Sequence, residues 1–214
     1  MRSNRTGRAL FMLGVISASA SCAFAAGGGC APLTFDLSHV ITNPLFGGTP
    51  GNCPTVWVCS GSPAPGFASY VPTVSQYPGV SPLPATSAYS PTTNQGSGVI
   101  RQLTLGSWVG GLTYLLNFWV GLPATEPNGT TPVAGWPGSQ GAARLYLTAG
   151  NDFSQVKAYD IPSPTSGKWA SNPISFTLPT NSPAVGKQIG IMIYVSASYY
   201  DAANFDIMPF SCPV

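Results

Sequence analysis

The chain has 214 residues, of which only 7% are charged, and it contains 25 Gly and 22 Pro. Its 8 basic and 6 acidic residues give a net charge of +2, but Arg2, Arg5 and Arg8 lie in an N-terminal segment that we expect to be removed. Without these three arginines, 5 basic and 6 acidic residues remain and give a net charge of −1, with His39 neutral. This charge excludes the basic patch of a nucleic-acid-binding protein and the polybasic segment of a protein held on an anionic membrane.

Residues 1–26 have the order of a secretory signal peptide. The three arginines precede an apolar run over residues 9–16, and small residues follow up to Ala25. A membrane anchor is the alternative, but the run is far shorter than the roughly 20 residues that span a bilayer. Lipid attachment at Cys22 is a second alternative, which Ser19 disfavours. We expect a mature chain of residues 27–214 without a transmembrane segment, located outside the cell, on its surface or in the periplasm.

Four cysteines remain in this expected mature chain, which is an even number for an exported protein and therefore indicates disulfides. Three pairings are open. We favour Cys53–Cys59, which closes a short loop, and Cys30–Cys212, which joins the two ends. A zinc site is not expected, because the spacing is irregular and His39 is the only histidine.

The first elements in chain order are a strand and a long loop. Leu33, Phe35 and Leu37 alternate with polar residues and predict a strand. Residues 43–97 then carry ten prolines, so we expect little central strand there and predict a long proline-rich loop. Its aromatic residues indicate a lid that packs on the domain.

Residues 98–121 are the centre of the predicted fold, as two extended segments joined by a Gly-rich turn in a hairpin. In the second segment five apolar residues fall on one side and predict a strand packed on a core: Leu112, Tyr114, Leu116, Phe118 and Val120. In the first segment Arg101 shares its parity with Val99 and Leu103, which would turn a charge inward. Either that strand begins after Arg101, or a bulge resets its register.

A second Pro/Gly-rich loop covers residues 122–140 and includes Trp136, and alternating segments follow to the end of the chain. Strands are predicted near residues 144–148, 153–161, 174–178, 189–196 and 204–208. The high Gly and Pro content is also that of a disordered chain, but the regular alternation argues against disorder over the C-terminal two thirds. With no convincing amphipathic helix, eight or nine strands predict an all-β, antiparallel β-sandwich in a single domain.

Three segments together resemble the galactose-binding-like jelly-roll domains, a group that includes many carbohydrate-binding modules. They are residues 41–48 (ITNPLFGG), 111–121 (GLTYLLNFWVG) and 204–207 (NFDI). The resemblance spans about residues 33–209 and implies a jelly roll in which one concave sheet carries a sugar site. It also implies a structural calcium, for which Asp36 and Asp206 are the candidate ligands. Gly47 stands where relatives often have an acidic residue, and calcium prefers six to eight oxygen ligands, so the site is incomplete. No other cofactor is expected.

Side chains opposite the core parity form the candidate carbohydrate site. Asn117, Trp119, Arg144, Tyr146 and Tyr194 are expected to share the non-core face of three strands, with Trp136 at its rim. Aromatic rings stack on sugar C–H groups, and amide and guanidinium groups bind hydroxyls. The alternative for Trp119 is that the proline-rich loop covers its ring.

Catalysis is not expected, because no pair of carboxylates, nucleophile elbow or triad is visible in the sequence. We therefore expect a secreted, non-catalytic domain that binds an extracellular or cell-surface carbohydrate. The alternative is a structural protein of the bacterial surface, matrix or filaments whose partner is another copy of itself, since low charge limits repulsion between copies. A glycoside-acting enzyme is the least favoured alternative, because Glu126 lies in a Pro/Gly-rich loop and no motif ties a second carboxylate to it.

Overall fold

The computed structural model of the protein describes residues 33–62, 66–91, 97–126, 128–133, 143–196 and 199–206, and at residues 62, 91, 196 and 199–206 only the backbone. The predicted signal peptide, Cys30, Trp136 and Cys212 lie outside these ranges. Their predictions therefore remain predictions.

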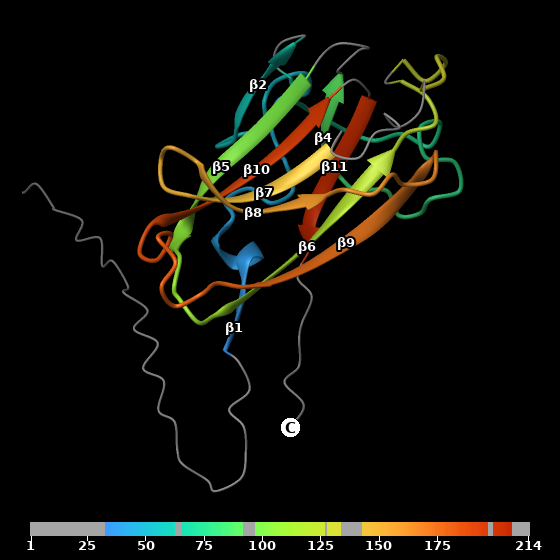
Figure 1. Ribbon diagram of the computed structural model, residues 1–214. Coiled ribbons are helices and arrows are strands. Elements are labelled where there is room, and N and C mark those ends of the chain that lie inside the picture. Colours follow the sequence, from blue (N-terminus) through green and yellow to red (C-terminus); the bar gives the residue numbers. More distant parts are fainter. Residues whose placement is uncertain are drawn as a thin grey trace, which may run out of the picture. The chain divides into compact units, whose positions relative to one another are not determined.

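Eleven strands and one short 3-10 helix make up the described part of the chain, so the protein is all-β as predicted (Figure 1). The elements are β1 Thr34–Asp36, η1 Leu37–Val40, β2 Val58–Ser62, β3 Ala68–Tyr70, β4 Ser87–Pro91, β5 Ser97–Ser107, β6 Thr113–Leu122, β7 Ala143–Ala149, β8 Ser154–Asp160, β9 Lys168–Thr177, β10 Gln188–Ser196 and β11 Tyr199–Asp206.

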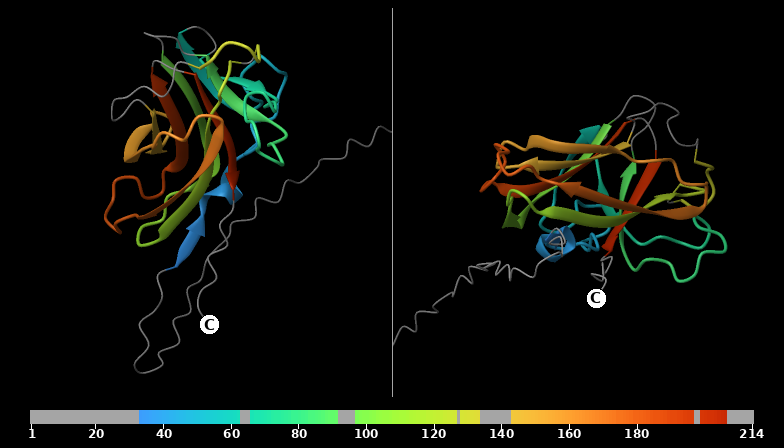
Figure 2. Two further views of the ribbon diagram at one scale, coloured as in Figure 1. Left: turned by 90° about the vertical axis from the view of Figure 1, so that its right-hand side faces the viewer. Right: turned by 60° about the horizontal axis from the view of Figure 1, so that its bottom comes forward.

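The strands form two sheets that pack face to face as a sandwich (Figure 2). Sheet A has the order β1-β6-β11-β4-β3. β1 and β11 pair with successive parts of one edge of β6, and β9 pairs along its opposite edge. Sheet B has the order β2-β5-β10-β7-β8. All pairs are antiparallel except β1 with β6, which is parallel over three residues.

The core lies between the sheets and is built from one parity of each central strand. In β6 the residues Tyr114, Leu116, Phe118 and Val120 are buried in it, which confirms the predicted core side of this strand. In sheet B the odd residues of β7 and β10 face them, from Leu145 and Leu147 to Ile191 and Ile193. Alternation in a strand sends the intervening side chains outward, away from the other sheet.

The parity predicted for β5 is wrong. This strand begins at Ser97 and alternates without a break through Arg101. Ile100, Gln102 and Thr104 are buried, so the odd residues face outward. The inward polar side chain is satisfied: Gln102 donates to the carbonyl of Thr42 at 2.7 Å and accepts from its N–H at 2.8 Å. A buried amide with both hydrogen-bond partners is tolerated in the core, whereas the charged guanidinium of Arg101 would be costly to bury.

Residues 98–121 do not form the expected hairpin. β5 belongs to sheet B and β6 to sheet A, so the Gly-rich turn between them crosses from one layer to the other. The predicted loop over residues 43–97 also contains β2, β3 and β4, and β4 lies inside sheet A between β11 and β3. The ladder between β4 and β3 involves residues 87–89 of β4 and so does not include Pro91, which lies at the end of the ladder between β4 and β11.

The segment before β2 is held by one side chain. The amide of Asn43 donates to the carbonyl of Gly47 at 2.7 Å and accepts from its N–H at 2.9 Å. Buried Phe46 packs on Trp57, with ring centroids 5.0 Å apart. The predicted Cys53–Cys59 disulfide is present in the same region. The motif that carried the family resemblance therefore has a structural role in this chain.

Candidate functional site

The structure divides the predicted carbohydrate site between two faces. Arg144, Tyr146 and Tyr194 point outward from sheet B, whereas Asn117 and Trp119 point outward from sheet A. Because the two outer faces of a sandwich point away from each other, the prediction of one shared face is wrong. The cause is that parity identifies the non-core side of each strand and does not tell to which sheet a strand belongs.

Sheet B brings its predicted residues together. In the register, Tyr194 lies opposite Arg144, and Met192 lies opposite both Tyr146 and Arg101. Directly opposed residues have Cβ atoms about 5 Å apart, so these side chains form one continuous surface on β5, β10 and β7. All five are half-buried. We call this surface the sheet B face; its members are Arg101, Arg144, Tyr146, Met192 and Tyr194.

An ion pair lies at one side of the sheet B face. Nε of Arg144 donates to Oδ1 of Asp160 at 2.6 Å, and both side chains remain well exposed, at 41% and 54%. Hydrogen bonds to Asp160 and then Tyr146 raise the pKa of the Arg144 guanidinium. The pair holds donors and acceptors beside a tyrosine ring, which is the arrangement that recognises neighbouring hydroxyl groups.

A cation–aromatic contact lies at the other side. The guanidinium carbon of Arg101 is 4.6 Å from the ring centroid of Phe153. Phe153 has a left-handed backbone, with φ of 52°, which is uncommon for an aromatic residue. Its ring lies next to Gly190, where an added Cβ would approach Cδ1 of Phe153 to 3.3 Å. Gly190 therefore makes room for the ring on which Arg101 rests.

The outer face of sheet A is largely covered. Asn117 is only 6% exposed, and Oγ of Ser171 donates to its Oδ1 at 2.8 Å. Further along β6, the loop after β3 places the buried ring of Tyr77 on Trp169, with centroids 4.6 Å apart. Gly121 has no room for a side chain beneath these two rings. Trp119 is half-buried on this face, as Tyr146 and Tyr194 are on sheet B, so the alternative that the proline-rich loop covers its ring stays a prediction.

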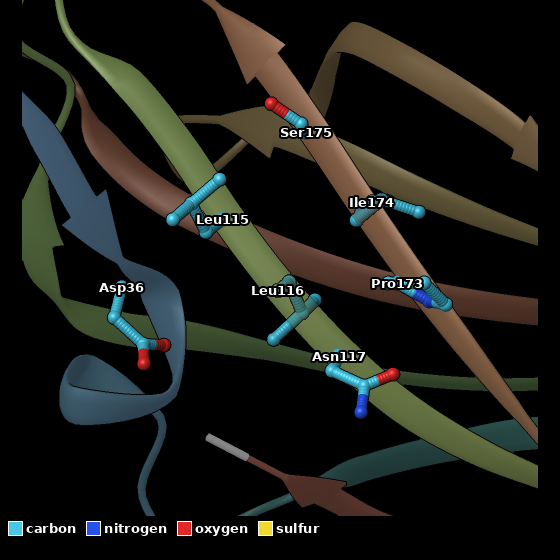
Figure 3. A pocket seen from close by; sticks show the side chains of 7 residues that line it. All are labelled: Asp36, Leu115, Leu116, Asn117, Pro173, Ile174 and Ser175. Atoms are coloured by element: carbon cyan, nitrogen blue, oxygen red, sulfur yellow. The ribbon is translucent and has the colours of Figure 1, made fainter. Parts of the chain in front are cut away.

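A small hollow of about 80 Å³ lies beside Asn117 (Figure 3). Asp36 borders it on one side of β6, and Pro173, Ile174 and Ser175 of β9 border it on the other. The carboxylate of Asp36 already accepts the N–H of Ser38 at 2.9 Å. A hollow of this size holds a few water molecules at most.

The two candidate calcium ligands lie close along one edge of β6. Asp36 pairs with Leu115 at the end of β1, and Asp206 pairs with Asn117 at the end of β11. Only the backbone of Asp206 is described. Across the described residues, no group of three or more His, Cys, Asp or Glu side chains could hold a metal ion. The calcium site at Asp36 and Asp206 therefore stays a prediction.

Sequence reasoning missed three contributors to the sheet B face and its borders: Arg101, Phe153 and Asp160. The apolar odd residues around Arg101 were expected to face inward, so Arg101 was explained by a later start of the strand or by a bulge, and neither is present there. The signal that would have corrected this is the opposite parity, where Gly98, Ile100, Gln102 and Thr104 are small or uncharged. Phe153 and Asp160 depend on strand pairing, which no local pattern reveals.

No family model matches the chain, and no curated protein matches it by sequence. Solved structures do match. The chain is similar to a cyclase from Fischerella sp. TAU, at 18% identity and a TM-score of 0.58 over 71% of this chain and 83% of that one. It is also similar to the arabinose-bound α-L-arabinofuranosidase MgGH51, at 17% identity and a TM-score of 0.51 over 81% of this chain and 28% of that one.

A weaker likeness is to TmCBM61, a carbohydrate-binding module in complex with β-1,4-galactotriose, at 10% identity and a TM-score of 0.44 over 71% of this chain and 86% of that one. The fold argument rests on the cyclase and the arabinofuranosidase: at 18% and 17% identity, these two matches show a shared β-sandwich fold, and a fold of this kind hosts many activities. Within the described ranges, no helix is long and apolar enough to cross a membrane.

Proposed function

We propose that the protein is an exported, non-catalytic domain that binds a neutral or weakly charged glycan on the sheet B face. The observation that carries the proposal is the register in which Tyr146 and Tyr194 lie on neighbouring strands beside Arg144. Two half-buried rings give a platform for the C–H faces of sugars, since aromatic side chains combine an apolar body with a polar end. Export rests on the signal-like segment of residues 1–26.

The polar groups of this face suit hydroxyl recognition. Arg144 and Asp160 are paired and exposed, so they can exchange part of their hydration for sugar hydroxyls without an unpaired buried charge. Because each hydroxyl exchanges water for a protein partner at little net gain, binding is expected to be weak. We expect dissociation constants from micromolar to millimolar, which correspond to about −8 to −4 kcal/mol.

A glycan array with the mature chain is the first test, followed by calorimetric titration of the best glycan. Tyr146→Ala and Tyr194→Ala should each weaken binding about tenfold, as loss of a stacking ring removes on the order of 1.4 kcal/mol. Tyr70→Ala is the matched control, because Tyr70 is a half-buried tyrosine of sheet A, and it should bind as the wild type does.

If both sheet B variants bind the glycan with the affinity of the wild type, the glycan site is not on the sheet B face. Trp119→Ala and Trp136→Ala then report whether binding involves sheet A or Trp136 in the loop predicted over residues 122–140. Unfolding curves of every variant separate loss of binding from loss of the fold.

A second candidate function is self-association as a structural protein. Val58 of β2 is 54% exposed and Leu105 of β5 is 83% exposed. Both residues lie at the border of the sheet B face. Exposed apolar side chains beside a polar sheet surface are typical of a protein contact. Light scattering over a range of concentrations tests it: a dimer or polymer that Leu105→Ser disperses, together with an empty glycan array, would favour this function.

A further inference from the structure

A hollow lies between the edge strands of the two sheets. It has a volume of about 420 Å³ and runs between β8, the edge of sheet B, and β9 of sheet A. The loop from Pro179 to Lys187 borders it. We call it the edge groove. Its volume lies in the range of small-molecule sites, roughly 300–1,000 Å³.

The inner wall of the edge groove is apolar. Leu178 and Ala184 are buried members of the core, and Val156 and Phe176 pack against that core while staying half-exposed. Phe176 meets Trp108 edge to face, with centroids 6.2 Å apart. Tyr159 of β8 donates its hydroxyl to the carbonyl of Ser175 at 3.2 Å and so ties the two edge strands together beyond the groove. The groove therefore offers a fixed apolar wall.

The charge of the edge groove has one sign. Lys157 and Lys187 are the titratable residues that line it, and no carboxylate does. Both lysines are exposed. They are two of the five basic residues outside the predicted signal peptide, in a chain with six acidic residues. The placement of two cations and no anion along one groove favours a negatively charged occupant.

The other three cations are engaged elsewhere. Arg101 rests on Phe153, Arg144 pairs with Asp160, and Nζ of Lys168 donates to the carbonyl of Pro78 at 3.3 Å. Among the described residues, Nζ of Lys157 lies 6.0 Å from the ring centroid of Tyr159 and makes no ion pair. Asp152 attracts Lys187, but among the described residues no ion pair joins the two side chains, and the Asp152 carboxylate is held by the hydroxyl and backbone N–H of Ser154. The ammonium groups of the groove are thus available to an anion.

We propose that the edge groove binds an amphipathic small molecule that has an apolar body about the size of two or three rings and a single anionic group. The body would lie on Val156 and Phe176, and the anionic group would be held between Lys157 and Lys187. This site is separate from the sheet B face and does not depend on glycan binding.

Two dyes test both halves of the proposal. The probe is 8-anilinonaphthalene-1-sulfonate, and its uncharged analogue N-phenyl-1-naphthylamine has nearly the same rings without the sulfonate. We expect saturable enhancement of fluorescence by the sulfonate dye with one site per chain. The uncharged dye should bind at least fivefold more weakly.

Charge variants locate the site. Lys157→Gln and Lys187→Gln should each weaken binding of the sulfonate dye about threefold, and the double variant about tenfold, as expected for partly exposed charges. Half-molar salt should reduce the wild-type affinity similarly, because it shortens the Debye length to about 4 Å. Lys168→Gln and Arg101→Gln remove cations outside the groove and should leave binding unchanged.

Three results would overturn the proposal: no saturable binding, equal binding of the two dyes, or a loss of binding in the Lys168 or Arg101 variant as large as in the groove variants. Binding by unfolded chains is excluded by recording thermal unfolding of each variant. The four substitutions are at the protein surface, so each variant is expected to fold.

Discussion

The guanidinium of Arg101 lies over the ring of Phe153, with 4.6 Å between its carbon and the ring centroid. The two residues belong to β5 and to the turn before β8, which are separated in sheet B by β10 and β7. The contact therefore spans the sheet B face, over Gly190, where the absence of a side chain leaves space. It links a charge on β5 to an aromatic ring in the turn before β8, on the outer surface of sheet B.

The energy of this contact can be measured with a double-mutant cycle. Arg101→Gln and Phe153→Leu should show a coupling of about 0.5–1 kcal/mol in urea unfolding, which is the range of exposed cation–aromatic pairs. The control cycle combines Phe153→Leu with Lys168→Gln, a cation of sheet A, and should show no coupling. A coupling equal to that of the control would mean that the Arg101 stack contributes nothing to stability.

Tyr114 should contribute through its hydroxyl as well as its ring. The hydroxyl accepts the N–H of Val109 at 2.6 Å and donates to its carbonyl at 3.2 Å. Tyr114→Phe is expected to cost about 1 kcal/mol at neutral pH, as the two hydrogen bonds are lost while the packing against Trp108 is kept.

Alkaline pH should shrink this difference. Burial raises the pKa of Tyr114 above its ordinary 10.0, and the bond to Val109 lowers it less. Because the folded pKa exceeds the unfolded one, the contribution of the phenol is present below pH 10 and is lost as the pH rises through the folded value. Unfolding at pH 8 and pH 11 should show Tyr114→Phe less stable than the wild type at the first and closer to it, or more stable, at the second. An unchanged difference would contradict the assignment.

The Cys53–Cys59 disulfide should contribute modestly to stability. It joins cysteines separated by six positions, and closing so short a loop stabilises by about 2 kcal/mol in the chain-entropy model. Replacing both cysteines by serine should lower the free energy of unfolding by that amount without changing the fold.

The expected mature chain should also contain no free thiol. This part of the prediction concerns Cys30 and Cys212, and intact mass after alkylation without reduction measures it. One or two added labels would reject the second disulfide, and Cys53→Ser with Cys59→Ser should not change the number of labels.

Calcium chelation should leave the melting temperature unchanged. The carboxylate of Asp36 already accepts the N–H of Ser38 at the start of η1, and the described residues bring no third carboxylate to this edge of β6. Thermal unfolding in EDTA and in millimolar calcium measures the effect. A calcium-dependent rise in melting temperature that Asp36→Asn abolishes would contradict this expectation and support a metal site. Asparagine keeps the hydrogen-bond acceptor for Ser38 and removes only the charge.

The candidate site was predictable in its residues and unpredictable in its assembly. Arg144, Tyr146 and Tyr194 were expected to face away from the core and do so, because alternation along a strand is a local property. Asn117 and Trp119 obey the same rule, yet they belong to the other sheet. Nothing within either strand records which layer it joins, so the two groups could not be separated from the sequence.

The amino-acid sequence by itself determined the all-β class, the core side of β6 and the Cys53–Cys59 pair, since period-two alternation and short-range spacing act over a few residues. Tertiary structure alone decided that the Gly-rich turn after β5 changes sheet, that Arg101 faces outward and that β8 and β9 enclose the edge groove. Each of these depends on which strands pair across long stretches of chain. That choice is made by the packing of the whole core, where Leu116 of one sheet meets the apolar side chains of the other.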